Sequence, residues 1–378
     1  MITSPLLYLF SLILIALALG TLERVTKHKV FTYLPSVVLL YALSMGLAQL
    51  GLWQENETLH NTYKSVKTVL LPAMLFVMLL QIDLKAFVGL GRSLIIAYVA
   101  SVLSLAVAFV GVFWLFSLDH DAAGVFATLA GSWTGGTANM LAVAGALEVR
   151  EELMGYALIV DSIDYTLWVM TLLALVAFGP AFNRWTKAPQ RFKNIEQTYS
   201  VTHKKVQPFS LVLLFLFSLL IAYLSNTLAS ILSGLSTTTW SVLFATLFGL
   251  IGSRTPLKEI AGSAPLSSAM LMLLIALIGS QAHLRGFGEV PLYLAVGLLI
   301  LAFHATIMVI VAKLFKLDLF SIGVASLANI GGVASAPILA AAYHRSLIGI
   351  AVLMAIMGYM IGTFAGLGIG YILEAIAT

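Results

Sequence analysis

Long apolar runs separated by short polar connections occupy almost the whole chain. A run of about 20 apolar residues is long enough to cross a bilayer as a helix. Twelve runs approach that length: 5–22, 31–53, 66–81, 93–117, 124–147, 154–181, 208–233, 238–252, 265–281, 291–314, 320–342 and 346–373. The run at 238–252 is short for a membrane span. The pattern therefore predicts an all-α polytopic membrane protein with about 11 spans, within a range of about 10–12.

Paired glycines and small polar residues interrupt two of these runs, 124–147 and 320–342. The interruptions read Trp133-Thr134-Gly135-Gly136-Thr137-Ala138-Asn139 and Asn329-Ile330-Gly331-Gly332-Val333-Ala334-Ser335. An unwound backbone survives in hydrocarbon only where protein, water or a solute satisfies its N–H and C=O groups. Matched breaks in two halves of a chain are typical of transporter binding sites. The alternative is that the small residues only allow helices to pack closely.

The two halves of the chain share a second motif. Gln81-Ile82-Asp83-Leu84-Lys85-Ala86-Phe87 ends one apolar run, and Gln281-Ala282-His283-Leu284-Arg285-Gly286-Phe287 ends another at a fixed offset. The glycine pairs keep nearly that offset. Internal duplication is therefore predicted, with a first membrane repeat at 1–183, a polar linker at 184–207 and a second repeat at 208–378.

Loop charges predict that the repeats are inverted. The run 124–147 follows acidic residues at 119–121, whereas 320–342 follows Lys313 and Lys316. Because basic loops favour the cytoplasmic side, the two broken helices would enter from opposite sides of the membrane. Inverted repeats require an odd number of membrane crossings between equivalent helices. Twelve spans would give an even number, so one candidate run must fail to cross the membrane. The short run 238–252 is the expected exception, which leaves eleven.

Composition supports the membrane assignment. Hydrophobic residues make up 61% of the 378 residues and charged residues only 10%, compared with about 25% charged in soluble domains. Mean hydropathy is +1.03. The first run lacks the basic start of a signal peptide, so a retained helix is expected. Without cysteine, disulfides and thiolate metal sites are excluded. No concentrated basic face suggests a nucleic-acid partner.

A broken helix places one set of free N–H groups and one set of free carbonyls inside the membrane. Hydroxyl and amide oxygens beside them are hard, neutral ligands of the kind that alkali ions accept. The predicted solute-binding residues are Trp133, Thr134, Gly135, Gly136, Asn329, Gly331, Gly332 and Ser335. The predicted cation-binding residues are Ser132, Thr137, Asn139, Asp161 and Asp164, with sodium at Thr137, Asn139 and Asp161.

The run 154–181 contains the two acids of this set. Asp161, Asp164 and Trp168 share one helical face because they are spaced by three and four residues. Intramembrane carboxyls are costly, so they suggest function by default. The pair is expected either to bind a cation or to share a proton. Alternatively, Asp161 lies near a helix end in water and has no role. His304, in mid-run, is either a proton relay or a hydrogen-bonded structural residue.

The order of these motifs resembles that of the YjcL-like family of integral membrane proteins of unassigned function. The likeness rests on the motifs 82–87, 135–139, 161–168 and 331–337 and on the glycine-rich final run. That family is in turn similar to the bile acid and sodium symporters and to the sodium/proton antiporters. The resemblance implies a panel domain and a core domain in which 124–147 and 320–342 cross at mid-membrane. It places Asp161 at the position of the cation-site carboxylate.

These features predict a secondary active transporter and not an enzyme. Sodium, or else protons, would drive symport of a small polar or anionic organic solute by alternating access. No GxxxxGK[ST] motif occurs, which favours an ion gradient over ATP as the energy source. We expect a multi-pass protein of the cell (inner) membrane, with the solute and the lipid bilayer as partners. No cofactor is expected beyond the coupling ion, and a homodimer is a possible assembly.

Three other functions are alternatives to this prediction. A cation/proton antiporter without an organic substrate would use Asp161 and Asp164 to exchange protons for sodium. An intramembrane aspartyl protease needs two acids on separate facing helices, whereas both acids here share one helix. A passive channel suits paired helix breaks less well than a transporter that rocks around a fixed site.

Overall fold

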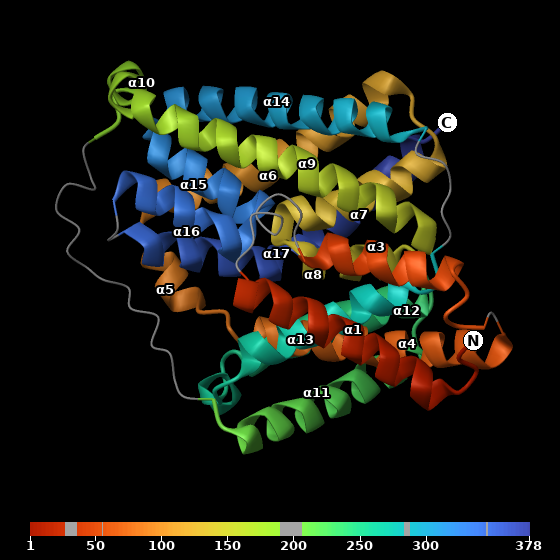
Figure 1. Cartoon of the computed structure of the whole chain (residues 1–378). Coiled ribbons are helices and arrows are strands. Elements are labelled where there is room, and N and C mark those ends of the chain that lie inside the picture. The colour runs from red at the N-terminus through yellow and green to blue at the C-terminus, as the bar shows by residue number, and fades with distance from the viewer. Residues whose placement is uncertain (27–35, 55, 190–205, 283–287, 345–346) are drawn as a thin grey trace. The chain divides into compact units, whose positions relative to one another are not determined.

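The computed structural model describes residues 1–26, 36–54, 56–189, 206–282, 288–344 and 347–378. Within them the fold is all-helical, with one isolated bridge between Ile2 and Trp53. In chain order (Figure 1) the helices are α1 (Pro5–Thr26), α3 (Ser36–Gln49), α4 (Glu57–Leu79), α5 (Leu84–Val88), α6 (Arg92–Phe116), α7 (His120–Gly135), α8 (Thr137–Ala146), α9 (Glu151–Leu175), η1 (Val176–Phe178), α10 (Gly179–Thr186), α11 (Pro208–Ala229), α12 (Thr237–Gly252), η3 (Pro256–Glu259), α13 (Ser263–Gly279), α14 (Val290–Phe315), α15 (Leu319–Ile330), α16 (Gly332–Tyr343) and α17 (Ile348–Ile376). Residues 190–205 of the predicted linker and 283–287 of the repeated motif lie outside the described residues.

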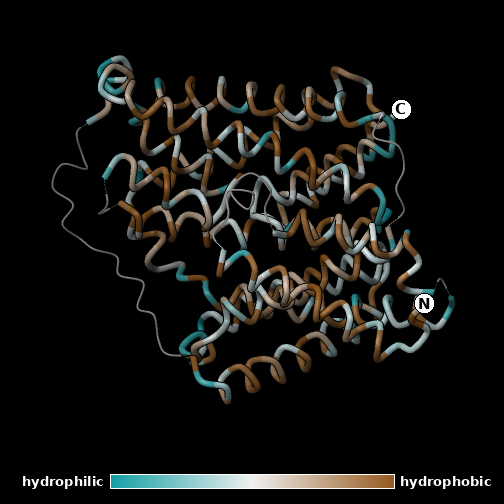
Figure 2. The backbone as a smooth tube through the Cα atoms, viewed as in Figure 1, coloured by the Kyte–Doolittle hydropathy of each residue, from teal (hydrophilic) through white to brown (hydrophobic). Residues whose placement is uncertain are grey.

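The prediction of an all-α, multi-pass membrane protein is confirmed. Among the described residues, seven helical segments are long and apolar enough to cross a bilayer: 5–23, 57–79, 92–116, 151–186, 208–229, 290–315 and 348–376. Figure 2 shows that apolar residues dominate the helices and that many hydrophilic residues lie at their ends. Shorter apolar helices account for most of the other predicted runs. The total number of crossings stays a prediction.

The helix predicted at 66–81 begins much earlier, at Glu57. Its first turns are polar, so a search for apolar runs misses them. The Asn56 side chain starts the helix by accepting a hydrogen bond from the Leu59 N–H at 2.8 Å. The polar turns carry His60, Lys64 and Lys67 on one face.

The helices form two compact units, and each unit draws on both halves of the sequence. The first unit contains Met1–Gln81, Ala144–Ser162 and Lys205–Val290. In it, α4 packs against α11, α12 and α13, and α13 packs against α3. Glycines allow the close approach of α12, because a methyl group at Gly249 would lie 2.6 Å from the Leu79 Cβ.

The second unit contains Ile82–Val143, Ile163–Lys204 and Pro291–Thr378. Its central helix is α17, which packs against α6, α7, α15 and α16. Helix α9 belongs to the first unit up to Ser162 and to the second from Ile163 onward. The two acids of α9 are therefore divided, with Asp161 in the first unit and Asp164 in the second.

Both glycine motifs divide a helix in two. Helix α7 ends at Gly135 and α8 begins at Thr137, while α15 ends at Ile330 and α16 begins at Gly332. The backbone φ angle is +84° at Gly136 and +60° at Gly332, a region that residues with a side chain rarely adopt. The leading helix of each pair begins in the same way. An aspartate, Asp119 or Asp318, caps its first turn through a side-chain oxygen.

Candidate functional site

Glycines at four-residue spacing bring α17 against α7 without a side chain between them. A methyl group at Gly362 would lie 2.5 Å from the Cα of Gly135, and one at Gly366 would lie 2.8 Å from the Cα of Gly131. These distances leave no room for a side chain at either position, as in close-packed membrane helix pairs. Close packing therefore explains why a glycine occupies position 135, which the sequence analysis assigned to solute binding.

Asn139 is a predicted cation ligand, and both polar atoms of its side-chain amide form hydrogen bonds within the second unit. Its Nδ2 donates to the Gly135 carbonyl at 2.7 Å and lies 3.4 Å from the Gly358 carbonyl oxygen. Its Oδ1 accepts a hydrogen bond from the Thr363 hydroxyl at 2.6 Å. Asn139 thus closes the first break and ties it to α17.

The other predicted residues of the first break are mostly buried. Thr134 donates its hydroxyl hydrogen to the Ala130 carbonyl at 2.7 Å, with the Gly362 carbonyl at 3.3 Å. The ring of Trp133 is fully buried and lies 5.5 Å from that of Phe109. Ser132 is also buried, and its carbonyl accepts from the Gly136 N–H. Thr137 is half-buried at the first position of α8.

Asn329 presents an oxygen without a hydrogen-bond partner at the second break. Its Nδ2 lies 2.9 Å from the Ser101 Oγ and 3.2 Å from the Ala325 carbonyl oxygen. A carbonyl only accepts, so the amide atom facing it must be the nitrogen. The Oδ1 atom is buried and has no partner among the described residues.

Ser335 places a second such oxygen at this break. Its Oγ is buried and also has no hydrogen bond within the described part of the chain. A methyl group at Gly331 would contact this Oγ and would lie 2.5 Å from Cε2 of Tyr165 on α9. Gly332 has open space where a Cβ would lie. Each unsatisfied buried polar group costs about 1–3 kcal/mol, so a group that donates to either oxygen, or a cation that binds it, would stabilise the second break.

The two breaks approach the same glycine of α17. A methyl group at Gly358 would lie 3.3 Å from the Gly135 Cα and 3.4 Å from the Thr134 carbonyl oxygen of α7. It would also lie 3.7 Å from the Ala328 carbonyl oxygen, in the last turn of α15. The last turns of α7 and α15, which lead into the two breaks, therefore both lie close to Gly358.

Asp164 is the carboxyl of α9 that belongs to the same unit as both breaks. Its side chain is fully buried, whereas Asp161 is half-buried and belongs to the first unit. One helical turn after Asp164, on the same face, Trp168 donates to the Ser326 hydroxyl of α15 at 3.0 Å. Trp168 therefore links the acidic face of α9 to the helix that leads into the second break.

A buried polar cluster joins α6, α9, α14 and α15 through His304. The Nδ1 of His304 lies 2.7 Å from the Ser104 Oγ, and its Nε2 lies 2.8 Å from the Ser326 Oγ. Ser104 donates its hydrogen to the Ser101 carbonyl at 2.9 Å, so it accepts from Nδ1–H. Ser326 accepts from Trp168 and donates to Nε2. Neutral His304 thus satisfies both hydroxyls, which favours its structural role over a proton relay.

Replacing His304 tests the role of this cluster. His304→Leu should destabilise the protein by about 1–3 kcal/mol, because two buried hydroxyls each lose one of their hydrogen bonds. His304→Gln retains one donor and one acceptor and should lose less. Thermal unfolding of the detergent-purified proteins measures both changes. Equal losses for the two variants would contradict the hydrogen-bonding role.

Sequence reasoning missed the residues that hold the breaks in place. Ser101 and Ser104 lie in an apolar run, and their three-residue spacing on one helical face was the available signal. Thr363 lies in the glycine-rich final run and reaches Asn139 across 224 positions of sequence. Nothing local to either segment indicates that contact.

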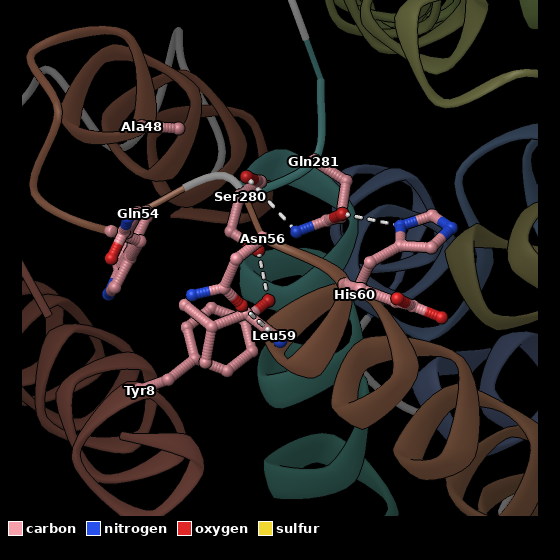
Figure 3. A pocket seen from close by; sticks show the side chains of 10 residues that line it. Tyr8, Ala48, Gln54, Asn56, Leu59, His60, Ser280 and Gln281 are labelled. Carbon is pink, nitrogen blue, oxygen red and sulfur yellow. Dashed lines mark hydrogen bonds between the residues drawn. The ribbon is translucent and has the colours of Figure 1, made fainter. Parts of the chain in front are cut away.

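The first unit contains a cavity of about 430 Å³ whose polar side chains largely satisfy one another (Figure 3). Tyr8 and Ser280 share a hydrogen bond at 2.5 Å, and the His60 Nδ1 lies 3.1 Å from the Gln281 Oε1. The Oδ1 of Asn56 accepts from the Leu59 N–H. These bonds involve the polar side chains of five lining residues: Tyr8, Asn56, His60, Ser280 and Gln281.

In the part of the chain that the structure describes, an all-helical fold, seven membrane-length segments and two interrupted helices define a polytopic membrane protein. The chain belongs to the DUF819 family, described as a protein of unknown function, whose sequence profile matches residues 10–376. No curated protein matches the sequence. The match agrees with the predicted membership of an uncharacterised family. The relation to bile acid and sodium symporters stays a prediction.

Proposed function

We propose that the protein is a secondary active transporter that couples the movement of a small polar or anionic organic solute to sodium, or else to protons. The observation that carries the proposal is the pair of buried oxygens at the second break, Asn329 Oδ1 and Ser335 Oγ, which lack partners among the described residues. Unwound backbone beside such oxygens is characteristic of transporter sites at mid-membrane.

The chemistry of the second break suits a cation. An amide oxygen fixed by the bonds of its own nitrogen, together with a hydroxyl oxygen, supplies two neutral, hard ligands. The side chains of Thr134 and Asn139 at the first break already bond to protein groups. The proposal therefore places the coupling ion at Asn329 and Ser335, with Asp164 supplying negative charge. Sodium at Thr137, Asn139 and Asp161 stays the prediction from sequence.

The finer architecture belongs to the same proposal. Equivalent aspartate caps at Asp119 and Asp318 support internal duplication. Opposite loop charges support inversion of the repeats, and the approach of both breaks to Gly358 supports crossing of the broken helices. On this basis the panel and core domains, the inner-membrane location and alternating access are proposed together.

Buried Asp164 also favours a second candidate, a cation/proton antiporter without an organic substrate. An intramembrane carboxyl is well suited to bind a proton and a cation in turn. The two candidates differ in one measurable property. A symporter gains thermal stability from an organic solute together with its ion, whereas an antiporter gains stability from the ion alone.

The test uses the purified full chain in detergent. Sodium chloride should raise the thermal unfolding midpoint relative to potassium chloride at equal ionic strength. The free energy of unfolding should increase by about 2.7 kcal/mol when sodium exceeds its Kd by about 100-fold. Asp164→Asn should lose this difference, and Asp161→Asn is the matched variant on the same helix. Loss only in Asp161→Asn would support the ligand set predicted from sequence.

A metabolite screen in sodium then identifies the solute, and proteoliposomes with an imposed sodium gradient measure its uptake. Wild-type protein that responds equally to sodium and potassium would exclude sodium coupling. Absence of gradient-driven uptake for every stabilising solute would contradict symport.

A further inference from the structure

Helix α10 continues the chain beyond the length that a bilayer core requires. Helix α9 has 25 residues, so at about 1.5 Å per residue it alone covers a hydrocarbon core of about 30 Å. Together with η1 and α10 the helical segment 151–186 reaches 36 residues. Part of this segment must therefore lie outside the core. Helix α10 is its polar end, since it carries Asn183 and Arg184, and so belongs at the level of the lipid headgroups.

Three contacts hold α10 against the end of α14 and the start of α15. The Asn183 Oδ1 accepts a hydrogen bond from the Leu319 N–H at 2.9 Å. The Lys313 Nζ donates to the Trp185 carbonyl and lies 4.5 Å from the centroid of the Trp185 ring. All three helices belong to the second unit, and Figure 1 shows the end of α14 beside α10. The position of α10 is therefore set by specific contacts.

These contacts gather four cationic side chains, which we call the basic surface. Its members are Arg184 and Lys187 of α10 and its cap, and Lys313 and Lys316 at the end of α14. All four are exposed, and none forms an ion pair with another described residue. Asp318 is the only acid in α10, α14, α15 and the residues that join α14 to α15. It is buried and caps the start of α15.

The two helix ends at this surface do not neutralise its charge. The C-terminal end of a helix carries about half a negative elementary charge, and those of α10 and α14 both lie here. With the carboxylate of Asp318, the negative charge amounts to about two elementary charges, against four cations. An excess of about two positive charges remains. Favourable placement of lysine at a helix end therefore does not explain the whole surface.

The opposite end of the second unit is acidic. The rings of Tyr293, in the first turn of α14, and Phe126 of α7 lie 5.6 Å apart, so α7 begins at the end of α14 remote from Lys313. Asp119 and Asp121 occur at the start of α7. The 26 residues of α14, about 39 Å in length, separate the two ends. Since basic residues favour the cytoplasmic side, the basic surface is expected to face the cytoplasmic leaflet, where anionic lipids provide negative charge.

We propose that the basic surface binds the headgroups of anionic phospholipids. The charge excess attracts their phosphates, and lysine and arginine supply charge-assisted hydrogen bonds to them. The Trp185 ring, 48% exposed and 5.6 Å from the ring of Phe182, provides the apolar contact that a lipid chain accepts at the membrane interface. A free phosphate has no counterpart to that contact. The surface is distinct from the helix breaks, and the proposal does not rest on transport.

The experiment measures thermal stabilisation of the purified full chain by short-chain phosphatidylglycerol, with phosphatidylcholine of equal chain length as the reference. Phosphatidylglycerol should raise the unfolding midpoint more, and added salt should reduce the difference. Lys316→Gln should raise the half-maximal concentration of phosphatidylglycerol about fivefold, the usual effect of one charge at a lipid surface. Arg184→Gln combined with Lys316→Gln should raise it about 25-fold. Lys316→Arg keeps the charge and should retain most of the response.

Lys64→Gln is the matched control, because Lys64 is an exposed lysine of the first unit. It should leave the response unchanged. Each variant is compared with its own midpoint in phosphatidylcholine, so a lower starting stability does not hide the result. Equal stabilisation by the two lipids, or equal losses in Lys316→Gln and Lys64→Gln, would overturn the proposal. Stabilisation by inorganic phosphate as large as that by phosphatidylglycerol would also overturn it, since a free anion would then be the ligand.

Discussion

Ser335→Ala is expected to raise the stability of the protein in sodium-free buffer and to abolish its response to sodium. The Ser335 hydroxyl is buried without a hydrogen bond to the described residues, so its removal relieves a cost of about 1–3 kcal/mol. The same hydroxyl is a proposed ligand of the coupling ion. Thermal unfolding in potassium and in sodium measures both effects in one experiment.

Ser326→Ala is the matched control for this experiment. Ser326 is equally buried, but it accepts from Trp168 and bonds to His304. Its loss should destabilise the protein in both salts by about 1–3 kcal/mol. If Ser335→Ala destabilised the protein as Ser326→Ala does, the Ser335 hydroxyl would have a structural partner, and the proposed ion site would lose its main support.

Gly362→Ala is expected to destabilise the second unit by about 1–3 kcal/mol, the usual cost of an overpacked interior. The new methyl group would lie 2.5 Å from the Gly135 Cα, and a backbone atom cannot move aside as a flexible side chain can. The displacement would also disturb Asn139, whose amide bonds to Gly135 and Thr363. Reduced thermal stability together with a reduced sodium response is the expected result.

Gly368→Ala provides the comparison on the same helix. Nothing lies within 4 Å of the methyl group that this substitution adds. Because alanine favours the helix over glycine by about 0.5–1 kcal/mol, the variant should be neutral or slightly stabilised. Similar destabilisation by Gly362→Ala and Gly368→Ala would mean that the contact with α7 does not control the effect.

The lengths of the apolar runs were sufficient to predict most of the long helices, and the glycine pairs within two runs predicted the location of both breaks. The signal is strong because hydrocarbon requires long apolar segments and excludes irregular backbone. The polar start of α4 escaped detection for the same reason, since Glu57 to Lys67 satisfies no apolar criterion. Each compact unit is built from segments that are far apart in the sequence. No local sequence pattern predicts this division, because the packing partners come from distant parts of the chain.

The roles of the site residues were harder to predict than their positions. Asn139 and Asn329 have the same side chain in similar motifs, and the sequence made Asn139 the cation ligand. In the structure, Thr363 occupies the Asn139 oxygen, whereas the Asn329 oxygen has no partner among the described residues. The contacts that decide which amide oxygen remains available join residues more than 200 positions apart in the sequence. Such contacts form only when the chain folds, so the sequence motifs do not reveal them.

The contact between α7 and α17 distinguishes the two breaks. At the first break the glycine backbones of the two helices lie so close that a methyl group at Gly362 would lie 2.5 Å from the Gly135 Cα. At the second break Gly332 is buried, but nothing lies within 4 Å of the position that a Cβ would take. A larger residue at position 362 would therefore have to push two helices apart, whereas the constraint on position 332 is its positive φ angle.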